Sequence, residues 1–326
     1  MARTKGRIPA AYHDVLAEHR ARLHRVTKGS GLKQMEAFYK STQAQLESKL
    51  RKLVGAGRGD TMTAAQARVL LAQARQGQAQ LAHAMVGQLG ELSNEAQVVA
   101  LRGLEKDLAK LDAAFEVSQV TLPIAEAGRF AGVIEGRAQS LLEQHMSSMS
   151  NWGVSAVGNI KTSLATSLAT GETVHEAVSR IAETTDAQWW RVERVVVTET
   201  SWAAAAATSD GLEDAKQDAV PDLLSRWVEL VSDETGEPMD DRVGVDSLAI
   251  HAQVTDPGGM FTMPAESDVP DAKGRTAVSE ALVGKSWPHP PDRPNDRSLI
   301  QGWRASWGIP GWRYNGGERD WIVPMK

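Results

Sequence analysis

Apolar residues recur every three or four positions over most of the first 215 residues, a spacing that predicts helices rather than strands. The clearest stripe, in residues 93–119, consists of Val98, Leu101, Leu104, Leu108, Leu111 and Phe115. A second stripe, in residues 31–53, consists of Leu32, Met35, Phe38, Leu46, Leu50 and Leu53. Alanine, glutamine, leucine, glutamate and arginine, which favour helices, dominate the remaining positions. The first two thirds of the chain are therefore predicted to be helical.

Glycines divide this helical region. Residues 55–59 read Gly-Ala-Gly-Arg-Gly and should end the helix over 31–53. Either Thr61 or Thr63 is expected to cap the next helix, which should end near Gly90. That helix is rich in alanine and glutamine and poor in large apolar side chains. Small side chains let neighbouring helices approach closely but bury little apolar area. This composition is typical of an elongated bundle or of a surface shared with a partner.

Four more helices are predicted, over residues 124–150, 153–170, 174–181 and 186–215. Thr173 is the expected cap of the third of these, and the segment 184–186 is the expected cap of the fourth. Three consecutive valines, 195–197, favour a strand by propensity, but the alanine run 203–207 and the flanking charges favour a helix. A helix is therefore predicted here.

The pattern changes after about residue 221. Residues 226–231 alternate polar and apolar side chains and lead into a turn, which predicts a short strand. Residues 248–254 and 259–263 are candidates for further strands. Most of the 13 prolines and six of the ten tryptophans lie in the last 110 residues. Aromatic side chains are therefore expected to fill an irregular core.

These patterns predict an α+β fold, with a mainly α-helical N-terminal region of extended or bundled helices before a small, loop-rich C-terminal domain. The expected division is a basic helical arm over 1–60, a helical domain over 61–220 and a Trp- and Pro-rich α+β domain over 221–326. A length of 326 residues fits two or three domains.

Charge is distributed unevenly along the chain. The net charge is −5, yet residues 1–58 carry thirteen lysines and arginines against four acids. Such an arm favours an acidic partner surface or nucleic acid, and the alternative is a solvated helix face. The candidate contact residues are Arg20, Arg22, Arg25, Lys49, Arg51 and Lys52.

Several classes of protein are excluded or disfavoured. The chain has no cysteine, which excludes disulfides, thiolate metal sites and a cysteine nucleophile. The polar, basic beginning does not resemble a signal peptide, and no stretch is apolar enough to span a membrane. No cofactor-binding fingerprint is present, and no cofactor or metal is expected. A soluble protein of the cytoplasm or of a virus particle is the expectation.

Two groups of residues are candidates for function in the C-terminal region. His251 and His289 with Arg242 are the best set for acid–base chemistry, although their spacing fits no metal-ligand pattern, and ordinary packing histidines are the alternative. Tryptophan and arginine interleave near the end of the chain, and both dominate binding hot spots. The candidate interface residues are Trp303, Arg304, Trp307, Trp312 and Arg313, with an internal core as the alternative.

Three segments, in this order, resemble the phage minor head proteins, also called Mu F-like head morphogenesis proteins. The first is Arg194-Val-Val-Val-Thr-Glu199 before an alanine-rich helix. The second contains Trp227, Asp240-Asp-Arg242, His251, Gln253 and Phe261. The third runs from His289-Pro-Pro-Asp292 to Arg304. The resemblance covers about the last 130 residues.

The chain departs from the family pattern at the positions that carry reactive side chains there. Ser247 stands where the family commonly has histidine, Ala252 replaces a glycine, and the closing cysteines are absent, with Gly302-Trp-Arg304 in that region. If the family's histidine and cysteines form a metal or reactive site, this chain has lost it.

The resemblance implies a virion component, located in the capsid interior or at the portal vertex and in the host cytoplasm during assembly. The missing histidine and cysteines favour a structural role without catalysis. Its implied partners are the portal protein and the major capsid protein, in several copies per particle, with packaged DNA as a further partner and no membrane. Two alternatives stay open. One is a nuclease-like or toxin-like enzyme that uses His251, His289 and Arg242, and the other is a DNA-binding protein that acts through residues 1–58.

Overall fold

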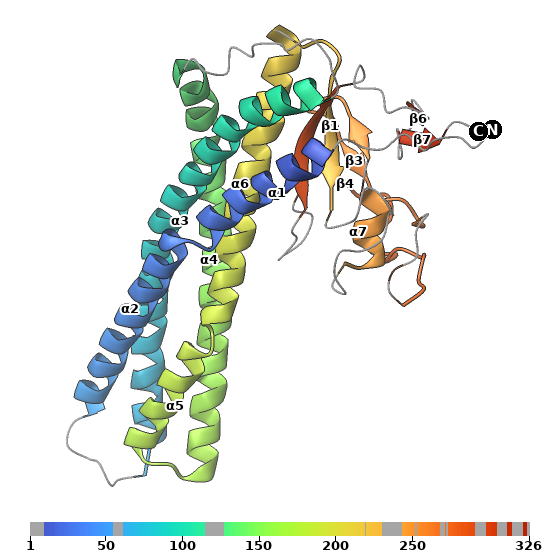
Figure 1. Cartoon of the computed structure of the whole chain (residues 1–326). Coiled ribbons are helices and arrows are strands. Elements are labelled where there is room, and N and C mark those ends of the chain that lie inside the picture. Colours follow the sequence, from blue (N-terminus) through green and yellow to red (C-terminus); the bar gives the residue numbers. More distant parts are fainter. Residues whose placement is uncertain are drawn as a thin grey trace. The chain divides into compact units, whose positions relative to one another are not determined.

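The computed structural model describes residues 10–54, 61–114, 127–218, 220–229, 243–251, 253–267, 271, 273–290, 298–304, 312–314 and 322–324 (Figure 1). A mainly helical N-terminal region, which extends to residue 218, precedes a small α+β region with short antiparallel sheets, as the sequence predicts. The helices are α1 (Ala10–Thr27), α2 (Ser30–Val54), α3 (Ala64–Ala114), α4 (Ala127–Thr170), α5 (Val174–Asp186), α6 (Trp189–Asp218) and α7 (Val245–Ile250).

Contacts divide the chain into two compact units. Unit 1 contains residues 1–25, 93–136 and 201–326, and unit 2 contains residues 26–92 and 137–200. Helices α3, α4 and α6 therefore each contribute residues to both units.

Unit 2 is built from helices. One of its apolar clusters includes Tyr39, Met85 and Trp152, and another includes Leu50, Leu70 and Ile160. The ring of Tyr39 packs against Trp152 at 5.9 Å and against Trp189 at 5.4 Å, and its hydroxyl donates to the carbonyl of Thr185. Because the ring is buried, the pKa of Tyr39 rises well above its usual value, so this hydroxyl keeps its proton at neutral pH.

Unit 1 contains the sheets. The strands are β1 (Leu223–Val228), β2 (Val254–Thr255), β3 (Phe261–Thr262), β4 (Ser286–Trp287), β5 (Leu299–Arg304), β6 (Trp312–Tyr314) and β7 (Ile322–Pro324). The largest sheet has the order β2-β1-β5 and is antiparallel, and β3-β4 and β6-β7 form antiparallel pairs.

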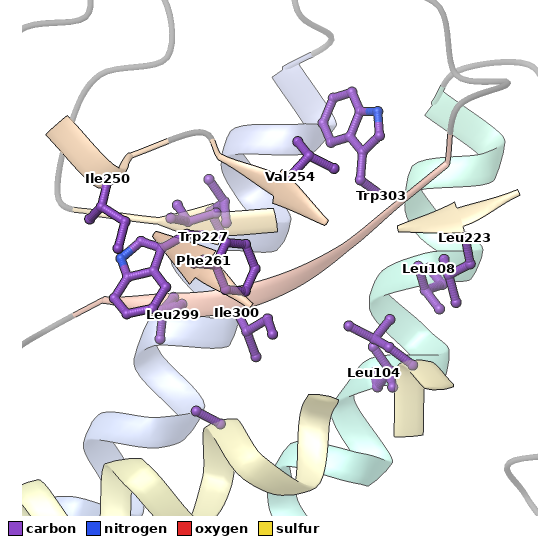
Figure 2. Packing of buried hydrophobic residues seen from close by; sticks show 14 of the residues in the cluster. Leu104, Leu108, Leu223, Trp227, Ile250, Val254, Phe261, Leu299, Ile300 and Trp303 are labelled. Carbon is purple, nitrogen blue, oxygen red and sulfur yellow. The ribbon is translucent and has the colours of Figure 1, made fainter. Parts of the chain in front are cut away.

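One face of this sheet packs on helices of unit 1. Ser225 pairs with Gly302 and Trp227 with Ile300. A Cβ at Gly302 would lie 2.7 Å from a methyl of Leu212 on α6 and 2.8 Å from one of Leu108 on α3, so glycine permits the close approach. Figure 2 shows Leu104 and Leu108 of α3 within the same apolar cluster as Trp227, Phe261 and Ile300.

Four predicted helix boundaries or element types are wrong. The helices expected to end near Gly90 and begin near Ser93 form the single helix α3, and those over 124–150 and 153–170 form the single helix α4. Burial explains both results: Leu89 and Leu92, like Met149 and Trp152, lie in a core of unit 2, and their packing outweighs the low helix propensity of glycine.

Thr184 is not part of a cap for α6. Its hydroxyl donates to the carbonyl of Arg180 within α5, and α6 begins only at Trp189. The strand expected over 248–254 is also wrong, because residues 245–250 form α7, and only Val254–Thr255 pair in the sheet. Five of the six residues of α7 are buried, so burial of both Leu248 and Ile250 does not require the two-residue period of a strand.

Candidate site around Glu229

A buried carboxylate follows β1. Glu229 is 3% exposed, and its Oε1 accepts hydrogen bonds from the indole Nε1 of Trp227 at 2.9 Å and from the hydroxyl of Ser298 at 2.5 Å. Trp227 and Glu229 are two residues apart, so an extended backbone directs both side chains to the same side. Ser298 directly precedes β5, which pairs with β1. The register of two strands thus assembles this site.

The backbone of Glu229 is held as well. Its N–H donates to Nδ1 of His251 at 3.1 Å, and its carbonyl accepts from the guanidinium of Arg20 at 2.7 Å. His251 lies at the end of α7, and Arg20 lies on α1. Since Nδ1 of His251 acts as an acceptor, a neutral ring carries its proton on Nε2. Four segments of unit 1 therefore meet at one residue.

Two more residues of the family-like pattern join the same region. The carbonyl of Gln253 accepts from the N–H of Trp227 at 2.9 Å. The side chain of Gln253 bonds both backbone groups of Thr262, as donor at 2.9 Å and as acceptor at 3.2 Å. Next to Thr262, the ring of Phe261 meets Trp227 edge to face, with the ring centres 5.4 Å apart. Both side chains are labelled in Figure 2. These contacts fix β3 against β1.

The other predicted catalytic residues have different surroundings. His289 is 3% exposed, its Nδ1 lies 2.9 Å from the carbonyl of Pro290, and its ring packs edge to face on Trp202 of α6 at 4.8 Å. Arg242 lies outside the described residues. In the part of the chain that the structure describes, no three His, Asp or Glu side chains gather as a metal site would require.

A second buried carboxylate lies in unit 2. Glu199 on α6 accepts from the amide of Gln144 at 2.6 Å and from the hydroxyl of Ser148 at 2.7 Å, both on α4. Nε2 of His145 lies 4.0 Å from the same carboxylate. Burial raises the pKa of Glu199, against the effect of the two hydrogen bonds, and burial lowers the pKa of His145 to about 4. The histidine is therefore neutral at physiological pH.

The predicted interface residues near the C-terminus are placed as follows. Trp303 is fully buried in unit 1, and the guanidinium of Arg226 lies 5.2 Å from its ring centre. Arg304 is half-buried and donates to Asp222 at 3.1 Å and to Asp112 at 3.0 Å. Trp312 and Arg313 belong to β6, and Trp307 lies outside the described residues.

The basic residues of the predicted arm fall into two groups. Arg20, Arg22 and Arg51 are half-buried and bonded within the chain: Arg20 to Glu229, Arg22 to Asp107, and Arg51 to Glu47 and Ser179. Arg25, in unit 1, and Lys49 and Lys52, in unit 2, are exposed.

Sequence reasoning did not find Glu229, Ser298 or His145 as site residues. The Trp227-x-Glu229 spacing within the predicted strand was the available signal for the first. Glu199 stood in the family-like segment, but nothing marked it as buried. Among the described residues, no helix is long and apolar enough to cross a bilayer. Comparison of the chain with protein-family models, with curated proteins and with solved structures found no match.

Proposed function

We propose that this chain is a structural minor head protein of a tailed-phage-like particle, which associates with the portal or inner capsid and assists head assembly or DNA delivery. One observation carries the proposal. Trp227, His251, Gln253 and Phe261, all from the family-like central segment, form one connected set of contacts around β1 and Glu229. The family-like residues of this segment thus share one packed site, as a structural module requires.

The contacts of these residues support a structural role rather than catalysis. Nδ1 of His251 is occupied by a backbone N–H, and the carboxylate of Glu229 is buried under Trp227 and Ser298. A general base needs a lone pair within reach of its substrate. The described polar groups of this site instead tie together segments that are distant in the sequence, which suits a module that must stay rigid in an assembly.

The proposed partners are the portal protein and the major capsid protein, with packaged DNA as a further partner. The exposed cations Arg25, Lys49 and Lys52 are suited to a phosphate backbone or an acidic protein face. The proposed location is the virion, in the capsid interior or at the portal vertex, with several copies in each particle and no membrane association.

A binding assay tests the proposal. The purified chain is immobilised and offered, in separate experiments, the portal protein and the major capsid protein of the particle to which it is proposed to belong. We expect the immobilised chain to retain the portal protein. Changing Arg25, Lys49 and Lys52 together to glutamate should weaken this retention, because exposed cations favour an acidic partner surface. Lys33→Glu, at an exposed position outside this set, is the control for charge alone. Retention of neither protein would overturn the proposal.

A nuclease assay tests the competing enzymatic hypothesis. Plasmid and single-stranded DNA are incubated with the chain and with the His251→Ala/His289→Ala variant, in the presence of Mg²⁺. We expect no cleavage by either protein. Cleavage by the original chain that the double variant loses would replace the structural proposal with an enzymatic one.

A further inference from the structure

Two long stretches of this chain contain no acidic residue, although the whole chain has 41. They are residues 61–90, which include the first half of α3, and residues 144–171, which include the second half of α4. Both belong to unit 2. Their only lysines and arginines are Arg68, Arg75 and Lys161, and all three are exposed. A charge-poor, slightly cationic surface on two helices is unusual for a face that meets only water, because acids are depleted in the centres of protein interfaces.

The same two stretches line a groove. Its volume is about 540 Å³, and α3 and α4 supply all its lining residues. Ala79 from α3 and Gly153 from α4 are small lining residues that leave space, and Met146 and Val154 contribute larger apolar side chains. Arg75 and His83 are the basic side chains of the lining, and both are exposed. A hollow flanked by apolar side chains is thus formed by helices of a single unit.

The length of the groove suits a helix. Its lining extends from Arg75 to Val86 on α3 and from Met146 to Val157 on α4, about three turns in each case. Val154 is 72% exposed and Met146 is 49% exposed, so large apolar groups face solvent beside small ones. An amphipathic helix that lies in such a groove covers these groups with side chains at intervals of three, four and seven residues.

Charge decides between the possible occupants. A second copy that packed through the same face would bring Arg68, Arg75 and Lys161 against their own equivalents, with no acid from this face to pair them. Among the described residues, neither Arg68 nor Arg75 has a side-chain hydrogen bond or an ion pair within the chain. A partner helix with aspartate or glutamate beside its apolar stripe complements both the cations and the hollow.

We propose that the groove between α3 and α4 binds an amphipathic helix of another protein, with its apolar stripe in the hollow and its acidic flank toward Arg75. The inference uses contacts and charges of unit 2 only. It therefore stands whether or not the chain is a minor head protein.

A pair of synthetic helical peptides, about four turns long, provides the test. Both carry leucines at intervals of three and four residues, and they differ only in having glutamates or lysines beside that stripe. Binding is measured by fluorescence anisotropy at low salt. We expect the glutamate peptide to bind at least about tenfold more tightly than the lysine peptide, which corresponds to about 1.4 kcal/mol. Equal binding, or no binding of the glutamate peptide, would overturn the proposal.

Two substitutions localise the binding. Ala79→Glu places a bulky carboxylate in the groove and should weaken the glutamate peptide at least about tenfold. Ala84→Glu, at another exposed alanine of α3 outside the groove lining, is the matched control and should change nothing. Arg75→Glu should reverse the preference between the two peptides. Circular dichroism and thermal melting check that each variant is folded.

Analytical ultracentrifugation of the chain alone tests whether a second copy of the chain occupies the groove instead. We expect the chain to show no dimer that depends on the groove, so Ala79→Glu should leave its sedimentation unchanged. A dimer that this substitution dissociates, and Ala84→Glu does not, would assign the groove to a second copy and overturn the proposal. An Ala79→Glu variant that binds the glutamate peptide normally would overturn it as well, since the peptide would then lie elsewhere.

Discussion

Each unit of this protein buries a glutamate, and the two units satisfy it differently. In unit 2, Glu199 takes its hydrogen bonds from Gln144 and Ser148, one turn apart on a single helix. In unit 1, Glu229 is contacted by Trp227, by Ser298 and, through its backbone, by Arg20 and His251. Two packed helices suffice for the first glutamate, whereas the side chain and backbone of the second are together held by four segments.

This difference indicates how each unit responds to damage. A helical packing repeats its contacts along its length, so the loss of one side chain leaves neighbouring layers in place. The hydrogen bonds of Glu229 join it to His251, Ser298 and Arg20, which are 22, 69 and 209 residues away in the sequence. Each of these segments helps to hold the others in position. We therefore expect unit 1 to be more sensitive than unit 2 to single substitutions at its buried polar site.

The largest effect is expected from removing the ring at the centre of that site. Trp227 is fully buried, packs on Phe261 and donates to Glu229. Trp227→Ala should lower the free energy of unfolding by about 4 kcal/mol, because it opens a cavity and removes a donor. Urea unfolding followed by circular dichroism measures the change.

Trp190→Ala in unit 2 is the matched control. This ring is 52% exposed, and it meets solvent and the guanidinium groups of Arg191 and Arg194. We expect the control to cost less than about 1 kcal/mol. If the two variants lowered the free energy of unfolding equally, the account of Trp227 as the centre of a connected core would be contradicted.

The buried polar cluster of unit 2, which contains His145 and Glu199, should make the stability of the chain depend on pH. The folded chain holds the pKa of His145 at about 4, whereas an unfolded chain has it near 6.5. Between these values the unfolded state binds the extra proton, so stability should fall as the pH falls from about 6.5 to about 4. The expected loss is up to about 3 kcal/mol. Denaturant unfolding at a series of pH values measures it.

Glu199 acts in the opposite direction, because its raised pKa lets the folded state take up a proton first. His145→Gln should therefore remove most of the loss between pH 6.5 and about 5. Below that range, carboxylates whose pKa is lowered in the folded chain, such as Glu172 and Asp271, still cost stability as they take up protons. An unchanged pH profile in this variant would mean that His145 is not buried in neutral form.

The Glu229 carboxylate is expected to have a smaller effect than the Trp227 ring. Glu229→Ala leaves the indole of Trp227 and the hydroxyl of Ser298 without their acceptor and should cost about 2 kcal/mol. Glu229→Gln keeps an acceptor oxygen and should retain most of the stability, as measured by the same urea titrations. A glutamine variant as unstable as the alanine variant would indicate that the negative charge, rather than the hydrogen bonds, holds the site.

The smallest effect concerns a local feature of unit 2. Thr173 caps α5 in a reciprocal arrangement with Glu176, in which each side chain bonds the other residue's backbone N–H. Thr173→Ala should cost about 1 kcal/mol, and Thr173→Ser should cost less because serine keeps the hydroxyl. Thermal unfolding measures both, and a serine variant no more stable than the alanine variant would contradict the role of the cap.

Local features were predictable from sequence, and distant ones were not. The leucines of the predicted 98–115 stripe, Leu101, Leu104, Leu108 and Leu111, are buried as expected, and Thr173 caps α5. Both features depend on residues within a few positions of one another. Thr63, one of two predicted caps, directly precedes α3, and its hydroxyl accepts a hydrogen bond from the N–H of Gln66 in the first turn. The continuity of α3 through Gly87 and Gly90 was missed, because the packing that compensates for glycine is not visible in local propensity.

The candidate site shows the same division. The strand around Trp227 could be anticipated, with a shift of three residues, from its alternating pattern. Glu229 looked like one of many acids in that region, since only its pairing with Ser298 and Arg20 reveals that it is buried. His251 was a candidate for chemistry by residue type, whereas its contact with the Glu229 N–H depends on how α7 packs beside β1.

Particle composition tests the central proposal most directly. Particles from the organism that encodes this chain are purified on a density gradient, and quantitative mass spectrometry gives the ratio of this chain to the portal and major capsid proteins. The proposal predicts that the chain sediments with the particles, in numbers comparable to the portal subunits and far below those of the major capsid protein. Absence of the chain from assembled heads and from their assembly intermediates would contradict it.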